Sequence, residues 1–278
     1  MRTPAPVPLP SSASLPMSLP MSLPMSLPVS VSVSVSVSVS VNGSRSAADG
    51  PAVPMSPDAL AESALAAVGA GAGEVLVHPR TPCGRESLSP RVVGPVLEVL
   101  RRTGVGVALS VPVSIAAEPD PAGRLERVAS WTVLPDRAVV HFGQPGAAEL
   151  ARALLARGVA VDAVVPLGGG AGPEPLARFL AWPVREPRRV RLSAELAAAD
   201  PALVAGLRAL PPVPVLLYGR DAAAWPVLRL AARCGTGVRT GVGDVTHLPD
   251  GRPARSNAEL VSAARDLVAR AAATAASR

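Results

Sequence analysis

Short apolar runs alternate with longer amphipathic segments along most of this chain. The runs are rich in β-branched residues and cover 75–77, 105–109, 138–140, 159–165, 190–192, 213–217 and 237–240. An earlier run, 29–41, alternates valine with serine. Helical patterns follow and start near Pro57, Pro90, Pro121, Gly146, Pro173, Ala194, Ala222 and Ser256. Because short strands that alternate with helices pair in parallel, eight such units predict a (β/α)₈ TIM barrel, with an open doubly wound sheet as the alternative.

The first part of the chain has a different pattern. The tetrapeptide MSLP recurs at Met17, Met21 and Met25. A repeat this short forms no solenoid unit, so it predicts a disordered, polyproline-like tail over residues 1–28. The valine-serine tract has the period of a strand, with every valine on one face. We therefore expect one barrel domain over residues 29–278, with this tract either its first strand or a repeat-expanded segment whose register can slip.

Charge and cysteine content narrow the class of partner. The formal charge is +6, and every basic residue is an arginine scattered among Asp and Glu. A nucleic-acid-binding protein more often carries a basic stripe with interleaved aromatic residues, so we expect no nucleic-acid partner. No window is apolar for the roughly 20 residues of a membrane span, and prolines interrupt any secretory signal. Only two distant cysteines, Cys83 and Cys234, occur, which favours a cytoplasmic protein without a disulfide framework.

Polar residues end the apolar runs. In a TIM barrel the catalytic and binding residues lie at the C-terminal ends of the strands, around one mouth. The polar residues at these ends are Asn42, His78, Ser110, His141, Asp162, Ser193, Tyr218 and Arg239, with Asp244 just beyond. We expect them to face a common pocket, an expectation that depends on the predicted fold.

Longer motifs extend from about Val41 to the end of the sequence. They are VNGSR, PAVPMSPDALAESALAAVGAGAGEVLVHPR, GRESLSP, FGQPGAAELARALLARGV, AAAWPVLRLAARCG, VRTGVGD and LPDGRPARSNAELVSAAR. Together they resemble the β-keto acid cleavage enzymes, a family that includes 3-keto-5-aminohexanoate cleavage enzyme. The resemblance implies a homo-oligomeric (β/α)₈ barrel that binds one divalent metal, usually zinc. It also implies a retro-Claisen reaction in which a β-keto acid and acetyl-CoA give acetoacetate and a new CoA ester.

The metal site that this resemblance implies is incomplete. The family has two histidines spaced H-x-H after the second strand and a glutamate just before the aspartate that follows the eighth. A metal at this place would stabilise the enolate that carbon-carbon cleavage leaves, and a catalytic zinc needs three protein ligands and an open position. This sequence keeps His78 but carries Leu76 for the first histidine and Gly243 for the glutamate. If only ligands have been lost, Leu76→His with Gly243→Glu should restore zinc binding and acyl exchange.

Other residues of the expected mouth carry the remaining chemistry. Arg239 and Asp244 keep the family's spacing, which implies catalytic roles on the substrate carboxylate and in proton transfer; an ordinary ion pair is the alternative. The expected substrate-binding residues are Ser110, His141, Asp162, Tyr218 and Arg220. A rebuilt metal set of His78, His141 and one aspartate, Asp162 or Asp244, is also open, because zinc accepts nitrogen and oxygen ligands.

Two functions are consistent with these residues. The first is a β-keto acid cleavage enzyme, an acyltransferase whose metal site is degraded. The second is a catalytically silent barrel, a pseudoenzyme, that binds a small acid, a CoA ester or a partner subunit.

Overall fold

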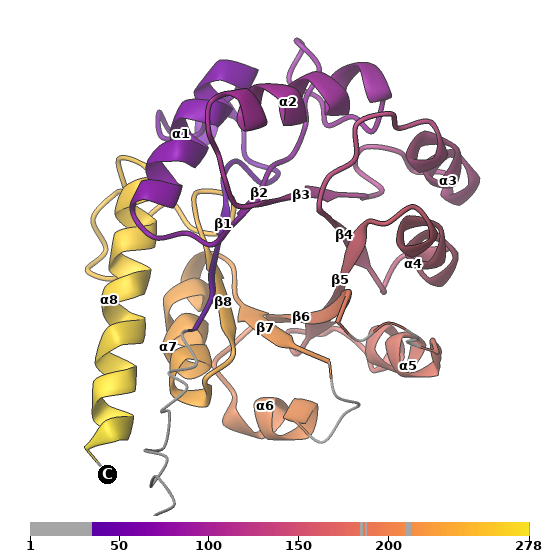
Figure 1. Ribbon diagram of the computed structural model, residues 1–278. Helices are drawn as coiled ribbons and strands as arrows, with labels where there is room; N and C mark the ends of the chain where they lie inside the picture. The colour runs from indigo at the N-terminus through magenta and orange to yellow at the C-terminus, as the bar shows by residue number, and fades with distance from the viewer. Residues whose placement is uncertain (1–34, 184–185, 187, 209–212, 278) are drawn as a thin grey trace, which may run out of the picture. The chain divides into compact units, whose positions relative to one another are not determined.

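Within residues 35–183, 186, 188–208 and 213–277, which the computed structural model describes, eight parallel strands form a closed barrel (Figure 1). Each strand pairs with the next, and the last pairs with the first. The strands are β1 (Val37–Ser40), β2 (Glu74–Leu76), β3 (Ala108–Pro112), β4 (Arg137–His141), β5 (Ala160–Leu167), β6 (Val190–Leu196), β7 (Val215–Tyr218) and β8 (Gly237–Thr240). The prediction of a TIM barrel is confirmed, and the open sheet is wrong.

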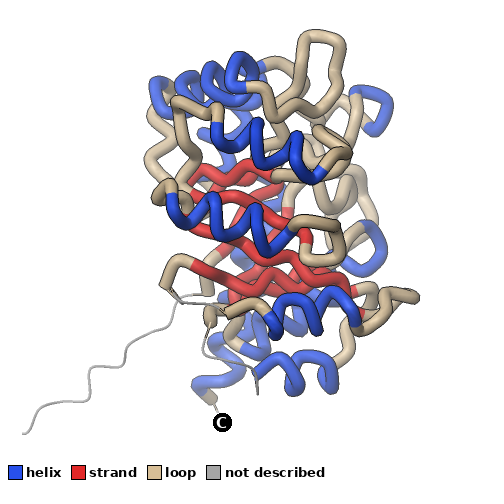
Figure 2. The backbone as a smooth tube through the Cα atoms, turned by 90° about the vertical axis from the view of Figure 1, so that its right-hand side faces the viewer, coloured by secondary structure: helices blue, strands red, loops and turns tan. Residues whose placement is uncertain are grey.

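Helices surround the barrel on its outside, as the side view shows (Figure 2). They are α1 (Pro57–Gly69), α2 (Pro90–Arg102), α3 (Pro121–Ala129), α4 (Ala147–Ala156), α5 (Glu174–Ala181), α6 (Pro201–Arg208), α7 (Ala224–Cys234) and α8 (Asn257–Ala276). Two short 3₁₀ helices, η1 (Ala47–Asp49) and η2 (Asp221–Ala223), lie in the loops after β1 and β7. No helix in the described part of the chain is both long enough and apolar enough to cross a membrane.

The described end of the valine-serine tract forms β1. Val37 and Val39 are buried in the core between strands and helices, whereas Ser38 and Ser40 are buried on the other face, inside the barrel. Both faces of a barrel strand are enclosed, so the alternation separates two buried surfaces. Residues 1–28, the predicted tail, lie outside the described residues.

The barrel interior is filled in layers along its axis. At the N-terminal ends of the strands, Glu74 and Asp162 form ion pairs with Arg137 and Arg191. An apolar layer follows, made of Leu76, Val139, Val164, Leu216 and Tyr218. Polar side chains occupy the third layer, at the C-terminal ends. The interior is therefore a packed core below and a site above, as the fold requires.

One predicted boundary is wrong. The alanine-rich segment after residue 192 predicts a helix that begins near Ala194, but β6 continues to Leu196 and α6 begins only at Pro201. Ala194 and Leu196 are buried in the outer core, so the period of two persists to the end of the strand. Consequently Glu195, between them, points into the barrel interior, where it contacts Tyr218.

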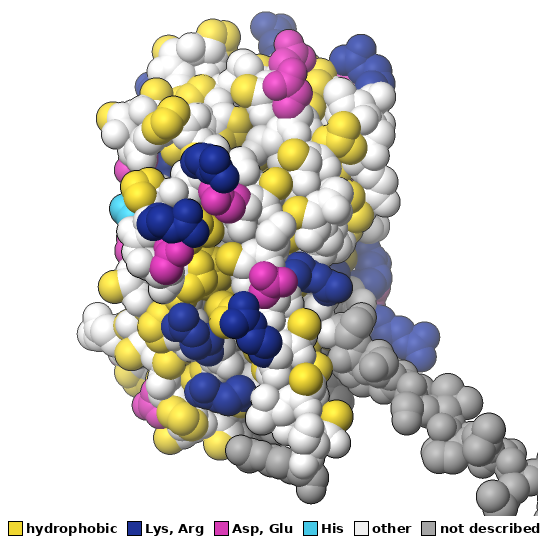
Figure 3. Space-filling model, turned by 90° about the vertical axis from the view of Figure 1, so that its left-hand side faces the viewer, with side chains coloured by type: hydrophobic (Ala, Val, Ile, Leu, Met, Phe, Trp, Pro, Cys, Tyr) yellow, Lys and Arg dark blue, Asp and Glu magenta, His cyan; other side chains and the backbone are white. Residues whose placement is uncertain are grey.

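The outer surface over α7 and α8 carries arginines, acidic residues and apolar side chains side by side (Figure 3). Three arginines, Arg229, Arg233 and Arg270, line an open hollow between these two helices. The positive charge of the chain is thus spread over its surface as well as gathered at the barrel mouth.

Candidate functional site

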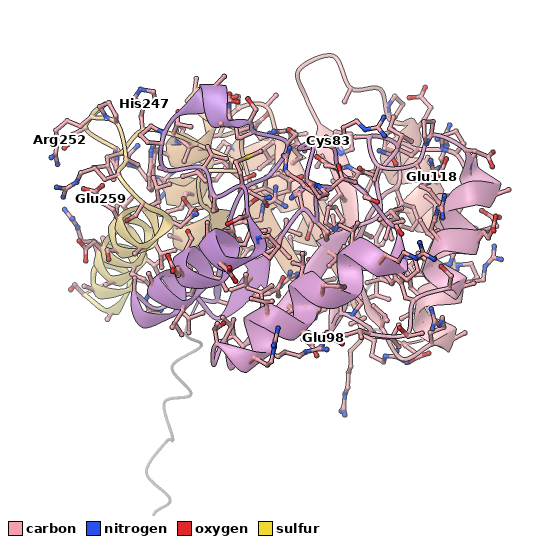
Figure 4. The ribbon with its side chains drawn as sticks, turned by 90° about the horizontal axis from the view of Figure 1, so that it is seen from above. Cys83, Glu98, Glu118, His247, Arg252 and Glu259 are labelled. Carbon is pink, nitrogen blue, oxygen red and sulfur yellow. The ribbon has the colours of Figure 1, made fainter. Side chains whose placement is uncertain are left out.

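A cavity of about 180 Å³ opens at the C-terminal ends of the strands. Figure 4 shows the barrel from the side, with the C-terminal ends of the strands along one edge. Cys83 and His247, in the loops after β2 and β8, lie along this edge, whereas Glu98 of α2 lies along the opposite edge. The polar residues that line the cavity include Ser40, His78, Glu86, His141, Glu195, Tyr218, Arg220, Arg239 and Asp244. This is the face on which TIM-barrel enzymes carry their active sites.

Arg239 and Asp244 form a buried, two-pronged ion pair. Arg239 donates from Nε to Oδ2 of Asp244 at 2.9 Å and from Nη2 to Oδ1 at 2.8 Å. Burial disfavours the charge on Arg239, but the attraction of Asp244 outweighs it and raises the pKa of the guanidinium. The guanidinium carbon lies 3.4 Å above the ring centre of Tyr218, within cation-π range. Two partners therefore hold this cation in one orientation.

Tyr218 links that cation to a carboxylate. Its hydroxyl donates a hydrogen bond to Oε2 of Glu195 at 2.7 Å. Burial raises the pKa of the Tyr218 hydroxyl, so the phenol stays protonated at neutral pH. The resulting chain, from Asp244 through Arg239 and Tyr218 to Glu195, fixes the side chains of three consecutive strands and the loop after the last.

Two imidazoles line the cavity in their neutral form. Burial, followed by the nearby charge of Arg239, lowers the pKa of His78 to about 3. Burial lowers the pKa of His141 to about 4, although the carboxylate of Glu195 opposes the shift. Asn42 positions His78, because its amide both donates to the carbonyl and accepts from the backbone N–H of that residue, each at 2.9 Å. Neutral imidazoles can accept a proton or bind a metal.

Arg220 is the more exposed cation of the mouth and has fewer contacts than Arg239. Its side chain is exposed, and Nη2 donates to the hydroxyl of Ser44 at 3.1 Å. None of the ion pairs among the described residues includes it. Its guanidinium is therefore available to an anion that enters the cavity.

Four of the residues expected to face the common pocket do not line the cavity: Asn42, Ser110, Asp162 and Ser193. Asp162 accepts hydrogen bonds from Arg191 and Arg137, and Ser110 donates to Glu74 at 3.0 Å. Both belong to the ion-pair layer at the opposite end of the barrel, so placing them at the mouth was wrong. The reason is that β3 and β5 extend two and five residues beyond them, to Pro112 and Leu167. The other candidates, His78, His141, Tyr218, Arg220, Arg239 and Asp244, do come together.

Sequence reasoning missed two carboxylates of the cavity, Glu195 and Glu86. The period of two in VRLSAEL contained the signal for Glu195, but the following alanines masked it. Glu86 lies in the loop after β2 and accepts a hydrogen bond from Ser114 at 3.3 Å; burial raises the pKa of its carboxyl. No strand pattern leads to a loop residue of this kind.

The residues present do not fit a zinc ion. Leu76 stands 3% exposed in the apolar layer, and a Cβ added to Gly243 would lie 2.2 Å from the hydroxyl of Ser40 and 2.7 Å from the backbone nitrogen of Gly43. The space of the family's glutamate is thus closed. No group of three His, Cys, Asp or Glu side chains in the described ranges is arranged to hold a metal.

The rebuilt metal set is also wrong for the same cavity. Asp162 lies in the other layer, and both carboxylate oxygens of Asp244 accept hydrogen bonds from Arg239. Neither aspartate of the rebuilt set is therefore free to join His78 and His141 in a three-ligand site.

Residues 34–165 and 193–278 of the chain match the model of a known family, the beta-keto acid cleavage enzymes. The chain belongs to the beta-keto acid cleavage enzyme family. No curated protein matches it. The family assignment agrees with the position of the cavity, and Leu76 and Gly243 stand where the resemblance implies two metal ligands.

Solved structures show the same fold at low sequence identity. A ternary complex of ObcA with a C4-CoA adduct and oxalate is 17% identical, with a TM-score of 0.58 over 80% of this chain; the chain spans 65% of that protein. Type I 3-dehydroquinate dehydratase from Clostridium difficile is 13% identical, with a TM-score of 0.55 over 85% of this chain and 93% of the other. The 3-dehydroquinate dehydratase from Geobacillus kaustophilus HTA426 is 12% identical, with a TM-score of 0.53 over 88% and 93%. At this identity they show the barrel alone.

Proposed function

We propose that this family member exchanges acyl groups between a small β-keto acid and acetyl-CoA. In this reaction R–CO–CH₂–COO⁻ and CH₃–CO–S–CoA become acetoacetate, CH₃–CO–CH₂–COO⁻, and R–CO–S–CoA. The observation that carries the proposal is the fixed guanidinium of Arg239 in the cavity, held by Asp244 and stacked on Tyr218. It supplies a fixed positive charge in the cavity, and cleavage of a β-keto acid there would develop negative charge on the substrate.

The size of the cavity supports a small acid as the substrate. Its volume of about 180 Å³ is below the roughly 300–1,000 Å³ of pockets for drug-sized ligands. A keto acid head fits such a space, whereas coenzyme A does not. Acetyl-CoA would therefore present only its thioester end to the cavity, with the rest of the molecule outside it.

The side chains of the cavity suit proton transfer from the keto acid. Removal of a proton from the carbon between ketone and carboxylate gives an enolate, which Arg239 would stabilise through its third nitrogen, Nη1. Glu195 is the carboxylate of the cavity beside Tyr218 that is able to take that proton. Arg220 would attract the substrate carboxylate. No step is assigned to a metal, because the residues that remain do not fit one.

The proposal is tested by acetoacetate release from a panel of β-keto acids with acetyl-CoA, using protein treated with a chelator and protein supplemented with zinc. We expect release in both preparations. Arg239→Gln should lower the rate about 10²- to 10³-fold, the usual effect of removing one donor from a developing anion. Arg252→Gln is the matched control, because the side chain of Arg252 is 71% exposed and lies outside the cavity.

A second variant separates loss of activity from loss of the fold. Arg239 also neutralises the buried Asp244, so its replacement can disturb the fold. Glu195→Gln keeps the hydrogen bond with Tyr218 but removes a proton acceptor, and it should lower the rate about 10²- to 10⁴-fold. Unchanged rates in both folded variants, or no release with any keto acid, would contradict the proposal.

The alternative is a catalytically silent barrel that binds a small acid, a CoA ester or a partner subunit. It is favoured by the loss of two metal ligands at Leu76 and Gly243. Its signature is calorimetric binding of a β-keto acid without acetoacetate release. We also propose a cytoplasmic homo-oligomer; the low cysteine content supports the location, and the family tendency supports the assembly.

A further inference from the structure

A second hollow adjoins the cavity of the mouth. It has a volume of about 440 Å³ and lies among the loop after β5, the end of β6 and the loop after β7. Two side chains, Glu195 and Arg220, line both spaces, so the hollows meet at these residues. We call the second hollow the side compartment.

The walls of the side compartment are mainly apolar. They include Leu167, Leu196, Ala197, Ala222 and Ala223. Gly169 keeps the side compartment open, because a Cβ at this position would lie 2.6 Å from the Cβ of Ala197. The φ of Gly169 is +63°. A side chain at this glycine would meet the opposite wall, and backbone conformations of this kind favour glycine.

The carboxylates of the side compartment already have partners. Glu195 accepts the hydroxyl hydrogen of Tyr218, and Asp221 is paired with Arg45. A cationic group on a ligand would therefore find no carboxylate without a partner there. An apolar group, in contrast, would contact alanine and leucine side chains.

We propose that the side compartment binds the substituent R of the β-keto acid, and that R is an uncharged chain of several carbons. This inference rests on the proposed function for the position of the keto acid head in the adjoining cavity. The head lies beside Arg239, the carboxylate meets Arg220 where the two spaces join, and the chain extends between Ala197 and Ala222. The side compartment thereby selects the substrate by the length and charge of R.

The test measures binding by calorimetry for 3-oxobutanoate (acetoacetate itself), 3-oxohexanoate and 3-oxooctanoate, and it measures acetoacetate release for the two longer acids. Because burial of each methylene stabilises a complex, affinity should rise roughly two- to fourfold for each methylene added. The compound 5-amino-3-oxohexanoate is a matched ligand control, and it should bind more weakly than 3-oxohexanoate. Equal affinity along the series, or tighter binding of the amino compound, would overturn the proposal.

Substitutions in the walls of the side compartment test where the substituent R of the keto acid binds. Ala197→Trp and Ala222→Trp, from two walls, should each weaken binding of 3-oxooctanoate at least about tenfold while leaving 3-oxobutanoate within about twofold, since only the longer ligand reaches them. Ala198→Trp is the control, because Ala198 is exposed and lines neither space. If the tryptophans instead weaken acetyl-CoA and leave the keto acids unchanged, the side compartment holds the pantetheine arm and the proposal fails.

Binding and release separate the two hypotheses. A length-dependent affinity without acetoacetate release refutes acyl exchange but supports the side compartment. Release that is independent of chain length supports acyl exchange and refutes the side compartment.

Discussion

Gly243 lies where two loops of the barrel mouth come closest. A Cβ on Gly43, whose φ is +54°, would lie 2.5 Å from the Cα of Gly243, and the reverse construction is equally crowded. The backbone after β1 therefore packs directly on the backbone after β8. The position of the family's glutamate has lost more than a side chain, since the space for that side chain is filled by main chain.

Restoring the ligands should consequently fail to restore the metal. The variant Leu76→His with Gly243→Glu needs a backbone shift, and overpacking of this kind typically costs ~1–3 kcal/mol. We expect a lower melting temperature and less than about a tenth of an equivalent of zinc per chain after dialysis, because a distorted three-ligand site holds metal weakly. The measurements are differential scanning calorimetry and elemental analysis. Leu76→His alone is the control for the effect of a polar group in the apolar layer, and one zinc per chain at an unchanged melting temperature would show that the loops can separate.

At the scale of the element, the ends of strands decide what belongs to the mouth. An inward-facing polar residue occurs at both ends of a barrel strand, and the period of two does not distinguish them. The pattern therefore predicts Asp162 at the mouth although it is the third residue of β5, and it does not predict Glu195 there although it is the sixth residue of β6. The existence of each strand could be predicted from its apolar run. The height of each strand residue along the barrel axis could not, because it depends on pairing with strands that are distant in the sequence.

The ion-pair layer at the N-terminal end of the barrel should contribute to the stability of the fold. Arg191 donates to Asp162 and Glu74, whose side chains are only 6% and 8% exposed. Replacing it by leucine leaves two buried carboxylates with Arg137 alone, and loss of one partner from a buried set costs about 3–5 kcal/mol. Arg152→Leu is the control, since Arg152 and Glu149 form an exposed pair worth ~0.2–1 kcal/mol. Urea unfolding followed by circular dichroism measures both; equal stability of the two variants would mean that water screens the layer.

At the scale of the whole molecule, the barrel could be predicted because its signals repeat. Eight apolar runs, each with a helical segment behind it, are consistent with one topology, and errors at single boundaries leave the count intact. The residues of the candidate site, in contrast, form no repeated sequence pattern. The cavities of the site depend on loops such as 168–172 and on contacts such as that between Tyr218 and Glu195, which only the folded chain brings together. The family match supplies the kind of chemistry but not the substituent that the substrate carries.

Closure of the barrel also predicts where the chain can be shortened. β1 begins at Val37 and pairs with both β2 and β8, and the family match begins at residue 34. Deleting residues 1–28 leaves every strand of the described barrel in place, so we expect an unchanged melting temperature by scanning calorimetry. Deleting residues 1–40 removes β1 and exposes the edges of its two neighbours, which should abolish the cooperative transition, because a parallel barrel with a missing strand leaves its backbone groups and core uncovered. A fall of more than about 4 °C on the shorter deletion, which is roughly 1 kcal/mol or more for a chain of this size, would mean that the first segment packs on the barrel and belongs to its fold.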